Sequence, residues 1–321
     1  MNRRHLIRAA LAACLVSVTT AALADQYPTK TVTVIIPFPP GGTLDVVGRM
    51  LAQKLSEQMG QSFVVDNRPG AGGTIGASAA AKARPDGYTL LFSPSTFVST
   101  PMTMPTPPYD AVKDFTPIAL VAKAPLAIAI RADLPFNDVK GLVAHAKANP
   151  GNVTFAIGSS ASAGHMSTEL LKRAAGIDYL VVPYKGSGPA YQDLIGGRID
   201  AFIDPILGSS SHAKAGRVKV IAVTSKERVP SLPSVPTVGE TIPGFEFYSW
   251  YGLWGPAKLP KEIADRLNAE VNKALAGDMK AKLTEQGLLL TPGSIEDFVK
   301  FQQDDTVKVA KIIKEANIRA E

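Results

Sequence analysis

Val32-Thr33-Val34-Ile35-Ile36-Pro37-Phe38 leads directly into Pro39-Pro40-Gly41-Gly42-Thr43-Leu44-Asp45, and this junction decides the fold. The first part is short, apolar and rich in β-branched residues, which is typical of a buried strand. Apolar residues then recur at steps of three and four, which predicts a helix; they are Leu44, Val47, Leu51 and Leu55. Glycine lets the backbone approach a ligand closely, and a helix begins with unpaired N–H groups at its positive dipole end. The junction therefore predicts a strand, an anion-binding turn and a helix.

A second glycine-rich turn, Pro69-Gly70-Ala71-Gly72-Gly73-Thr74-Ile75-Gly76, follows the next apolar run, Phe63–Asp66. It also lies where a strand is expected to pass into a helix. Two such turns on neighbouring strands would form an anion cradle without a charged side chain. Asp45 would repel an anion, so we expect it to brace the Gly41–Thr43 turn by accepting backbone N–H bonds.

Short apolar runs alternate with helical patterns along the chain, which is typical of βαβ units and mainly parallel sheets. The predicted strands are Val32–Phe38, Phe63–Asp66, Tyr88–Phe92, Ile118–Val121, Leu126–Ile130, Val153–Ile157, Tyr179–Val182, Ala201–Ile203 and Val218–Val223. An aromatic strand within Phe245–Pro256 holds both tryptophans, and its rings either pack in the core or line a cleft at a hinge. The pattern predicts a two-lobed α/β fold, with residues 25–123 and 245–321 in lobe 1 and residues 124–244 in lobe 2.

The first residues resemble a secretory signal peptide. Met1–Arg8 is basic, Ala9–Ala24 is apolar, and the apolar stretch closes with the cleavage pattern Ala22-Leu23-Ala24. We therefore expect residues 1–24 to be removed and the mature protein to lie in the periplasm. Arg3-Arg4 leaves both the general secretory route and the twin-arginine route open.

Composition excludes several classes of protein. The one cysteine, Cys14, lies in the predicted signal peptide, so the mature chain would have no disulfide and no thiol nucleophile. The net charge of the full chain is +6, and Arg3, Arg4 and Arg8 supply three of these charges. The remaining basic residues are scattered among acidic ones, so we expect no nucleic-acid binding. No other apolar run reaches the length of a membrane span, and we expect a soluble mature protein.

Motifs for catalysis are few. His165 follows a serine-rich loop, so a hydrolase that pairs it with Ser160 or Ser162 stays open as an alternative, although the G-x-S-x-G elbow is absent. Gly70–Ile75 departs from the dinucleotide fingerprint G-x-G-x-x-G, because Ile75 stands at its sixth position. The sequence also lacks the phosphate-loop motif and any cluster with the spacing of metal ligands. We therefore expect no enzyme activity, no cofactor and no metal site.

Loops of small residues follow several predicted strands, at the ends where open α/β sheets bind ligands. Each loop alone is typical of an ordinary turn or helix cap, but several on one side favour a site for a carboxylate or similar anion. The hydroxyl donors in these loops are Thr43, Thr74, Ser93, Ser159 and Ser162. Asp204 follows Ala201–Ile203, and we expect it to meet a hydroxyl, an amine or a bound water. Lys185 is a candidate positive charge.

Motifs in a fixed order along nearly the whole mature length resemble the solute-binding proteins of tripartite tricarboxylate transporters, the Bug family. They are Tyr27-Pro28, Pro37–Asp45, Asp66–Gly73, Asp86–Leu90, Val182–Ser187, Leu232–Thr237 and Trp250–Pro256. The chain departs from the family pattern at Gly48, where alanine is usual. This glycine costs roughly 0.5–1 kcal/mol of helix stability and does not change the implied function.

The resemblance implies a type II-like periplasmic binding protein, in which two α/β lobes close around a small carboxylated molecule through a hinge. It implies a di- or tricarboxylate, an acidic amino acid or an aromatic carboxylate as the ligand, carried by a monomeric receptor to membrane permease subunits. The first-lobe turns would grip one carboxylate through backbone groups and waters, at Gly42, Thr43, Gly73 and Thr74. The second lobe would discriminate the rest of the ligand, at Ser159, Ser162, Tyr184 and Asp204. A sensory module that docks on a membrane kinase stays open as an alternative, because its ligand step is the same.

Overall fold

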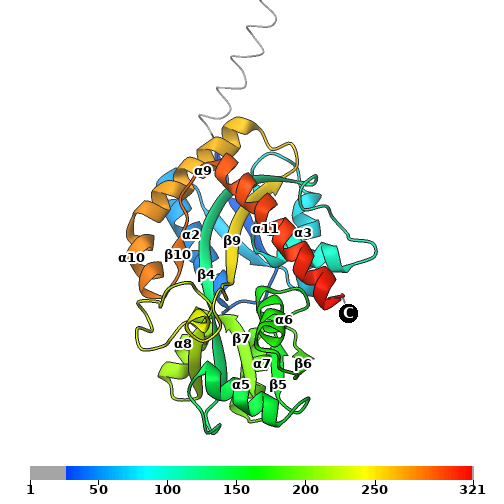
Figure 1. Ribbon diagram of the computed structural model, residues 1–321. Coiled ribbons are helices and arrows are strands. Elements are labelled where there is room, and N and C mark those ends of the chain that lie inside the picture. The colour runs from blue at the N-terminus through cyan, green and yellow to red at the C-terminus, as the bar shows by residue number, and fades with distance from the viewer. Residues whose placement is uncertain (1–26, 320–321) are drawn as a thin grey trace, which may run out of the picture.

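One long strand joins the two halves of the molecule. The computed structural model describes residues 27–319, and within them β4 (Phe115–Arg131) runs for 17 residues through both sheets (Figure 1). The sequence predicted two separate strands in this stretch, and that prediction was wrong. Pro125 favours a break because it lacks an N–H, but it ends the pairing of β4 with one sheet, and Leu126 begins the pairing with the other. The missing N–H of Pro125 is tolerated because β4 changes its strand partner here, from β9 to β7.

The first sheet has the strand order β2-β1-β3-β9-β4, and the short β10 also pairs with β4. Its other strands are β1 (Val32–Ile36), β2 (Phe63–Asn67), β3 (Thr89–Pro94), β9 (Tyr248–Pro256) and β10 (Leu289–Leu290). β1 is parallel to β2 and β3, whereas β9 is antiparallel to both β3 and β4. Because β1 and β2 are parallel neighbours, the two glycine-rich turns that follow them lie at the same edge of the sheet.

The second sheet has the order β6-β5-β7-β4, and β8 also pairs with β4. Its strands are β5 (Thr154–Ile157), β6 (Leu180–Pro183), β7 (Ala201–Pro205) and β8 (Val218–Val223). β5 is parallel to β6 and β7, and β4 is antiparallel to β7 and β8. The molecule therefore has two α/β lobes, as the sequence predicted.

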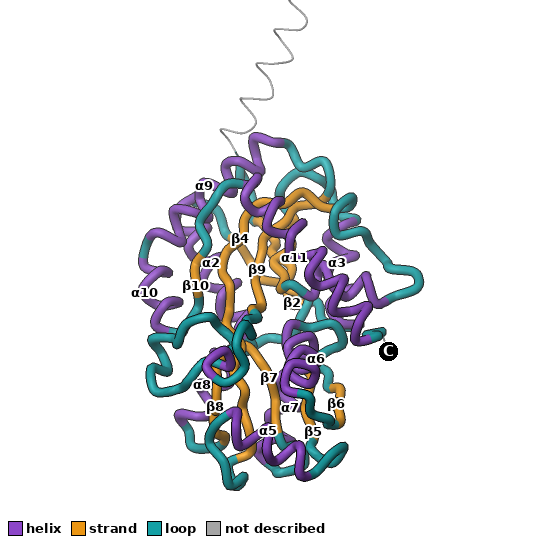
Figure 2. Tube along the Cα trace, in the orientation of Figure 1, coloured by secondary structure: helices purple, strands orange, loops and turns teal. Residues whose placement is uncertain are grey.

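Helices pack against both sheets (Figure 2). One face of the first sheet is covered by α2 (Thr43–Met59), α9 (Lys261–Ala276) and α10 (Asp278–Glu285). Its other face is covered by α3 (Thr74–Ala81), α4 (Thr96–Ser99) and α11 (Ile295–Ala316). The second lobe has α5 (Val139–Ala148), α6 (Ala163–Ala175), α7 (Ser187–Ile195) and α8 (Ile206–Lys214). The described chain also has the 3₁₀ turns η1 (Ala71–Gly73) and η2 (Thr100–Thr103), which come before β4, and η3 (Val238–Glu240), which comes after β8. No helix within residues 27–319 is long and apolar enough to span a bilayer. The predicted signal peptide, residues 1–24, lies outside the described residues.

The C-terminal helix α11 packs on both lobes (Figure 1). Near its start, Phe298 packs against Trp250 and Trp254 of β9, with ring centroids 6.0 and 5.2 Å apart. Both tryptophans are buried, so the core interpretation of the aromatic strand is confirmed for them. Near its end, α11 contributes to the core of the second lobe through Val309, Ile312 and Ile313. The lobe boundaries near residues 123 and 245 remain a proposal, and the change of strand partners at Pro125 supports the first of them.

Candidate functional site

The helix α2 begins without a side-chain cap. Gly42 is its N-cap residue, with an extended backbone (φ −81°, ψ 170°), and it has no side chain to accept from the first N–H groups. Thr43, the first helical residue, is buried. Free N–H groups and the positive end of the helix dipole favour an anion at this position. Side chains cap three other helices, α5 through Asp138, α6 through Ser162 and α11 through Ser294. The helices α4, α7, α8, α9 and α10 have no side-chain cap, so what distinguishes α2 is its place next to the second glycine-rich turn.

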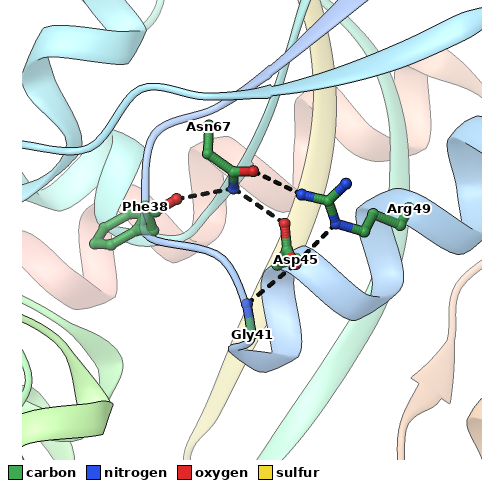
Figure 3. A network of polar contacts seen from close by, with 5 residues as sticks. All are labelled: Phe38, Gly41, Asp45, Arg49 and Asn67. Atoms are coloured by element: carbon green, nitrogen blue, oxygen red, sulfur yellow. Dashed lines mark hydrogen bonds and ion pairs between the residues drawn. The ribbon is translucent and has the colours of Figure 1, made fainter.

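A polar network holds this turn against the end of β2 (Figure 3). Asp45 Oδ2 accepts from the backbone N–H of Gly41 at 3.1 Å and from Arg49 Nε at 2.9 Å. Asn67 Nδ2 donates to Asp45 Oδ1 and to the carbonyl of Phe38, both at 3.0 Å. Burial raises the pKa of Asp45, but the hydrogen bonds from Arg49, Asn67 and Gly41 outweigh it, so the pKa lies below its ordinary value. Asp45 therefore braces the turn as a charged carboxylate, as the sequence predicted.

We expect Asn67→Ala to lower the free energy of unfolding by about 1–3 kcal/mol, because it leaves Asp45 Oδ1 and the Phe38 carbonyl without their donor. Urea denaturation measures the loss. The matched control is Gln53→Ala on α2, whose side chain makes an exposed hydrogen bond to Glu57 and should change stability by less than about 0.5 kcal/mol. Equal effects of the two variants would contradict a bracing role for Asn67.

The second turn packs against the first. Gly73, the N-cap residue of α3, has a φ of 95°, which favours glycine. A Cβ at this position would lie 3.0 Å from the ring of Phe38. Asn67 donates to the carbonyl of the same residue, so Phe38 links the two turns. Thr74 is buried, and its Oγ1 donates to the carbonyl of Ala71 at 2.9 Å. The structure thus places Gly42, Thr43, Gly73 and Thr74 on adjacent turns, and their contact with a ligand remains a prediction.

Three buried hydroxyl groups on neighbouring elements have no hydrogen-bond partner within residues 27–319. They belong to Ser93 in β3, Thr96 in α4 and Thr100 in η2. The Thr100 methyl would lie 3.3 Å from a Cβ on Gly72, so this hydroxyl-bearing residue is next to the second turn. Buried polar groups are nearly always hydrogen-bonded, which favours a water or ligand atom at these hydroxyls. Of the three, only Ser93 was predicted from the sequence as a hydroxyl donor, since nothing in the local pattern says that Thr96 and Thr100 are buried.

In the second lobe, Asp204 lies in β7 with 8% of its surface exposed. Its Oδ1 accepts from Ser187 Oγ, at the start of α7, at 2.8 Å. The Tyr191 hydroxyl lies near the same carboxyl and is 2.7 Å from Ser209 Oγ of α8. Burial raises the pKa of Asp204 to about 7, and the contacts with Ser187 and Tyr191 offset only part of this rise. In the described part of the chain, no three His, Cys, Asp or Glu side chains are grouped so as to hold a metal ion.

Tyr251 of β9 lies between the first-lobe turn and Asp204. Its pKa is raised by burial and further by the negative charge of Asp204, while contacts with Ser249 and Thr43 lower it. Tyr251 is therefore near both Thr43 in the first lobe and Asp204 in the second. Sequence reasoning missed this residue. Strand alternation could have found it, because it places Tyr251 on the face opposite the two tryptophans.

The loop before α6 contacts the first lobe, since Ser99 Oγ of α4 donates to the carbonyl of Ala161 at 2.7 Å. Ser159 is half-buried in this loop, and Ser162 Oγ accepts from the N–H of His165 at 3.1 Å. His165 Nδ1 accepts from the N–H of Ala161 at 3.2 Å, and burial lowers the pKa of His165 to about 4. In a catalytic pair the serine hydroxyl would donate to the imidazole. Here neither serine donates to His165 within the described residues, because Ser162 Oγ contacts the His165 N–H and Ser160 Oγ donates to the carbonyl of Arg319 at 3.3 Å. The geometry therefore does not support the hydrolase alternative.

The Tyr184 hydroxyl belongs to a different set of contacts. It donates to Asp193 Oδ2 of α7 at 2.8 Å, and Asp193 also forms an ion pair with Arg198 at 2.7 Å. Burial and the hydrogen bond to Asp193 raise the pKa of Tyr184 to about 12. The hydroxyl of Tyr184 is therefore engaged within the second lobe, and a ligand contact of this residue remains a prediction.

Comparisons with known proteins agree on one family. The family model described as tripartite tricarboxylate transporter family receptor matches residues 47–318. The solved structure of R. palustris Rpa4515 with adipate is 37% identical, with a TM-score of 0.88 over 91% of this chain and 99% of that one. The periplasmic binding protein BugD is 33% identical, with a TM-score of 0.84 over 92% of this chain and 100% of its own. MatC from Rhodopseudomonas palustris with bound malate is 32% identical, with a TM-score of 0.82 over 89% and 100%.

Proposed function

The chain belongs to the tripartite tricarboxylate transporter family of receptors, and from this premise we propose that it holds a small dicarboxylate between its two lobes. The resemblance identified from the sequence motifs is thereby confirmed, and the family is one of receptors, not enzymes. The observation that carries the proposal is the pair of helix N-termini of α2 and α3, which begin at glycines without side-chain caps. Backbone N–H groups at such ends bind anions.

The two lobes divide the recognition of the ligand. In the first lobe, the turns at Gly42 and Gly73 would bind one carboxylate, with the unpaired hydroxyls of Ser93, Thr96 and Thr100 nearby. Asp204 and its neighbours in the second lobe would face the other end of the molecule. Adipate and malate, the ligands named for two of the similar structures, each carry two carboxylates at the ends of a short chain. A dicarboxylate is therefore the ligand class that we infer for this protein.

The partner and the compartment follow from the same membership. We infer that the receptor works in the periplasm, where BugD is a binding protein, and delivers its ligand to membrane permease subunits of a tripartite transporter. The sequence begins with a secretory pattern, which supports export. We also infer that it acts as a monomer that closes around its ligand.

The test is calorimetric titration of protein that has been unfolded, dialysed and refolded to remove any bound ligand. We expect saturable binding of adipate, malate or another short dicarboxylate with one site per chain. Thermal unfolding should then shift upward, since a ligand at about 100 times its Kd stabilises by about 2.7 kcal/mol. Hexanoate is the matched control for adipate, because a methyl group replaces its second carboxylate at the same chain length, and it should bind more weakly. If no dicarboxylate, tricarboxylate, acidic amino acid or aromatic carboxylate binds, the proposed function is wrong.

A further inference from the structure

The carboxyl group of Asp204 is buried without a cation. Only 8% of the residue is exposed, and no basic side chain of residues 27–319 forms an ion pair with it. Its neighbours are hydroxyl groups: Ser187 Oγ donates to Oδ1 at 2.8 Å, and the Tyr191 hydroxyl also lies nearby. Gly208 of α8 packs against the carboxyl, since a Cβ there would lie 3.3 Å from Oδ2. Without a cation, a buried carboxyl favours its neutral form.

A second ionised carboxylate placed against Asp204 would be repelled. Two carboxylates that share a buried site retain a proton between them, because two negative charges in contact are unstable away from water. The first lobe offers an end that suits one carboxylate of the ligand. Asp204 lies near Tyr251, which also contacts Thr43 at the first-lobe turn. A dicarboxylate with one end at that turn and the other at Asp204 would therefore require one proton between the two carboxyl groups.

We propose that Asp204 binds the far carboxylate of the ligand as a neutral acid, donating its proton in an O–H···O⁻ hydrogen bond. This inference rests on the proposed function, because it assumes a dicarboxylate held by both lobes. The protons balance as follows. When Asp204 is ionised in the free protein, binding takes up one proton from the solvent to form its O–H group, and no bond of the ligand changes. The receptor thus selects ligands by their second carboxylate through a neutral acid, and Asp204 itself forms no ion pair within the described residues.

The titratable groups that face Asp204 are few. Tyr191 approaches from α7 and Tyr251 from β9, and burial raises the pKa of both far above the neutral range. The facing residues on α8 are Gly208 and Ser209, and β4 presents Ala127 opposite Asp204. His165 at the start of α6 has a pKa lowered by burial to about 4, so it stays neutral from about pH 6 upward. Asp204 is therefore the group in this cluster that titrates near neutral pH.

The experiment measures the affinity for adipate from about pH 6.5 to about pH 8.5, a range in which the ligand stays a dianion because free carboxyl groups titrate near about pH 4. For a group that titrates near pH 7 and binds only when neutral, the Kd should rise by about 25-fold across this range. Calorimetry in buffers of different ionisation enthalpy should give an uptake close to one proton per ligand at the upper end. Hexanoate, which has no far carboxylate, should show neither effect.

Two variants separate the proposal from a general effect of pH. Asp204→Asn keeps a neutral donor, so its affinity for adipate should be constant with pH and tighter than wild type at about pH 8.5. Ser187→Ala removes a hydrogen bond that lowers the pKa of Asp204, so the fall in affinity should move to higher pH. Thermal unfolding checks that both variants fold. An affinity of wild type that is constant or rises with pH would overturn the proposal, as would the same pH dependence in Asp204→Asn. Absence of binding at every pH would instead count against the proposed function.

Discussion

Gly42→Asp is expected to weaken dicarboxylate binding by more than about 100-fold and, at the same time, to stabilise the protein. Gly42 has an extended backbone that any residue adopts, and a Cβ there would meet no atom within 4 Å. Aspartate is among the best N-cap residues, and an acid at a helix N-terminus stabilises by about 0.3–1 kcal/mol. The same carboxylate would occupy the anion position and repel the ligand. Two unit charges about 5 Å apart at an effective dielectric of about 20 repel by about 3 kcal/mol, which corresponds to a factor above 100.

Opposite changes in stability and affinity distinguish a ligand site from a structural turn. Calorimetric titration with adipate gives the affinity, and urea denaturation without ligand gives the free energy of unfolding. The matched control is Gly42→Asn, which caps the helix with the same shape and no charge; it should weaken binding much less. If Gly42→Asp binds adipate as tightly as wild type, α2 does not bind the carboxylate, whatever the change in stability.

The local units of the fold could be predicted because neighbouring residues encode them. Gly60 ends α2 in the left-handed conformation with a φ of 70°, as expected for a C-cap glycine. Ser294 caps α11, and Asp297 three residues later completes the capping box. The continuity of β4 could not be predicted in this way. Whether Pro125 breaks a strand depends on which strands flank it, and those partners come from distant parts of the chain.

In the candidate site, too, the local features could be predicted and the long-range contacts could not. Glycine-rich turns and the bracing role of Asp45 follow from local sequence, and the structure bears out the brace. Asn67 was missed because its two acceptors lie 29 and 22 residues away in the sequence. The position of Tyr251 between the lobes depends on how β9 crosses the molecule. Asp204 was singled out, but its burial without a cation appears only once α7, α8 and β7 are packed together.

Gly164→Ala is expected to lower the free energy of unfolding by about 1–3 kcal/mol, the usual range for an overpacked core position. Gly164 is the second residue of α6, and an added Cβ would overlap the carbonyl oxygen of Ile203 in β7. A backbone oxygen in a strand cannot turn aside, so α6 must move away from β7. Ile203 immediately precedes Asp204, and the displacement should therefore also weaken ligand binding. Thermal and urea denaturation measure the first effect, and titration with adipate measures the second.

The chain offers a matched control for the loss of stability in Gly188→Ala. Gly188 is likewise the second residue of a second-lobe helix, α7, but a Cβ there would meet no atom within 4 Å. Replacing glycine by alanine at an unstrained helical position stabilises by about 0.4–1 kcal/mol, chiefly because the unfolded chain loses conformational freedom. The two substitutions should thus change stability in opposite directions, although they add the same methyl group at the same helical position. If Gly164→Ala is as stable as wild type, α6 and β7 are not in the close backbone contact that sets the position of Asp204.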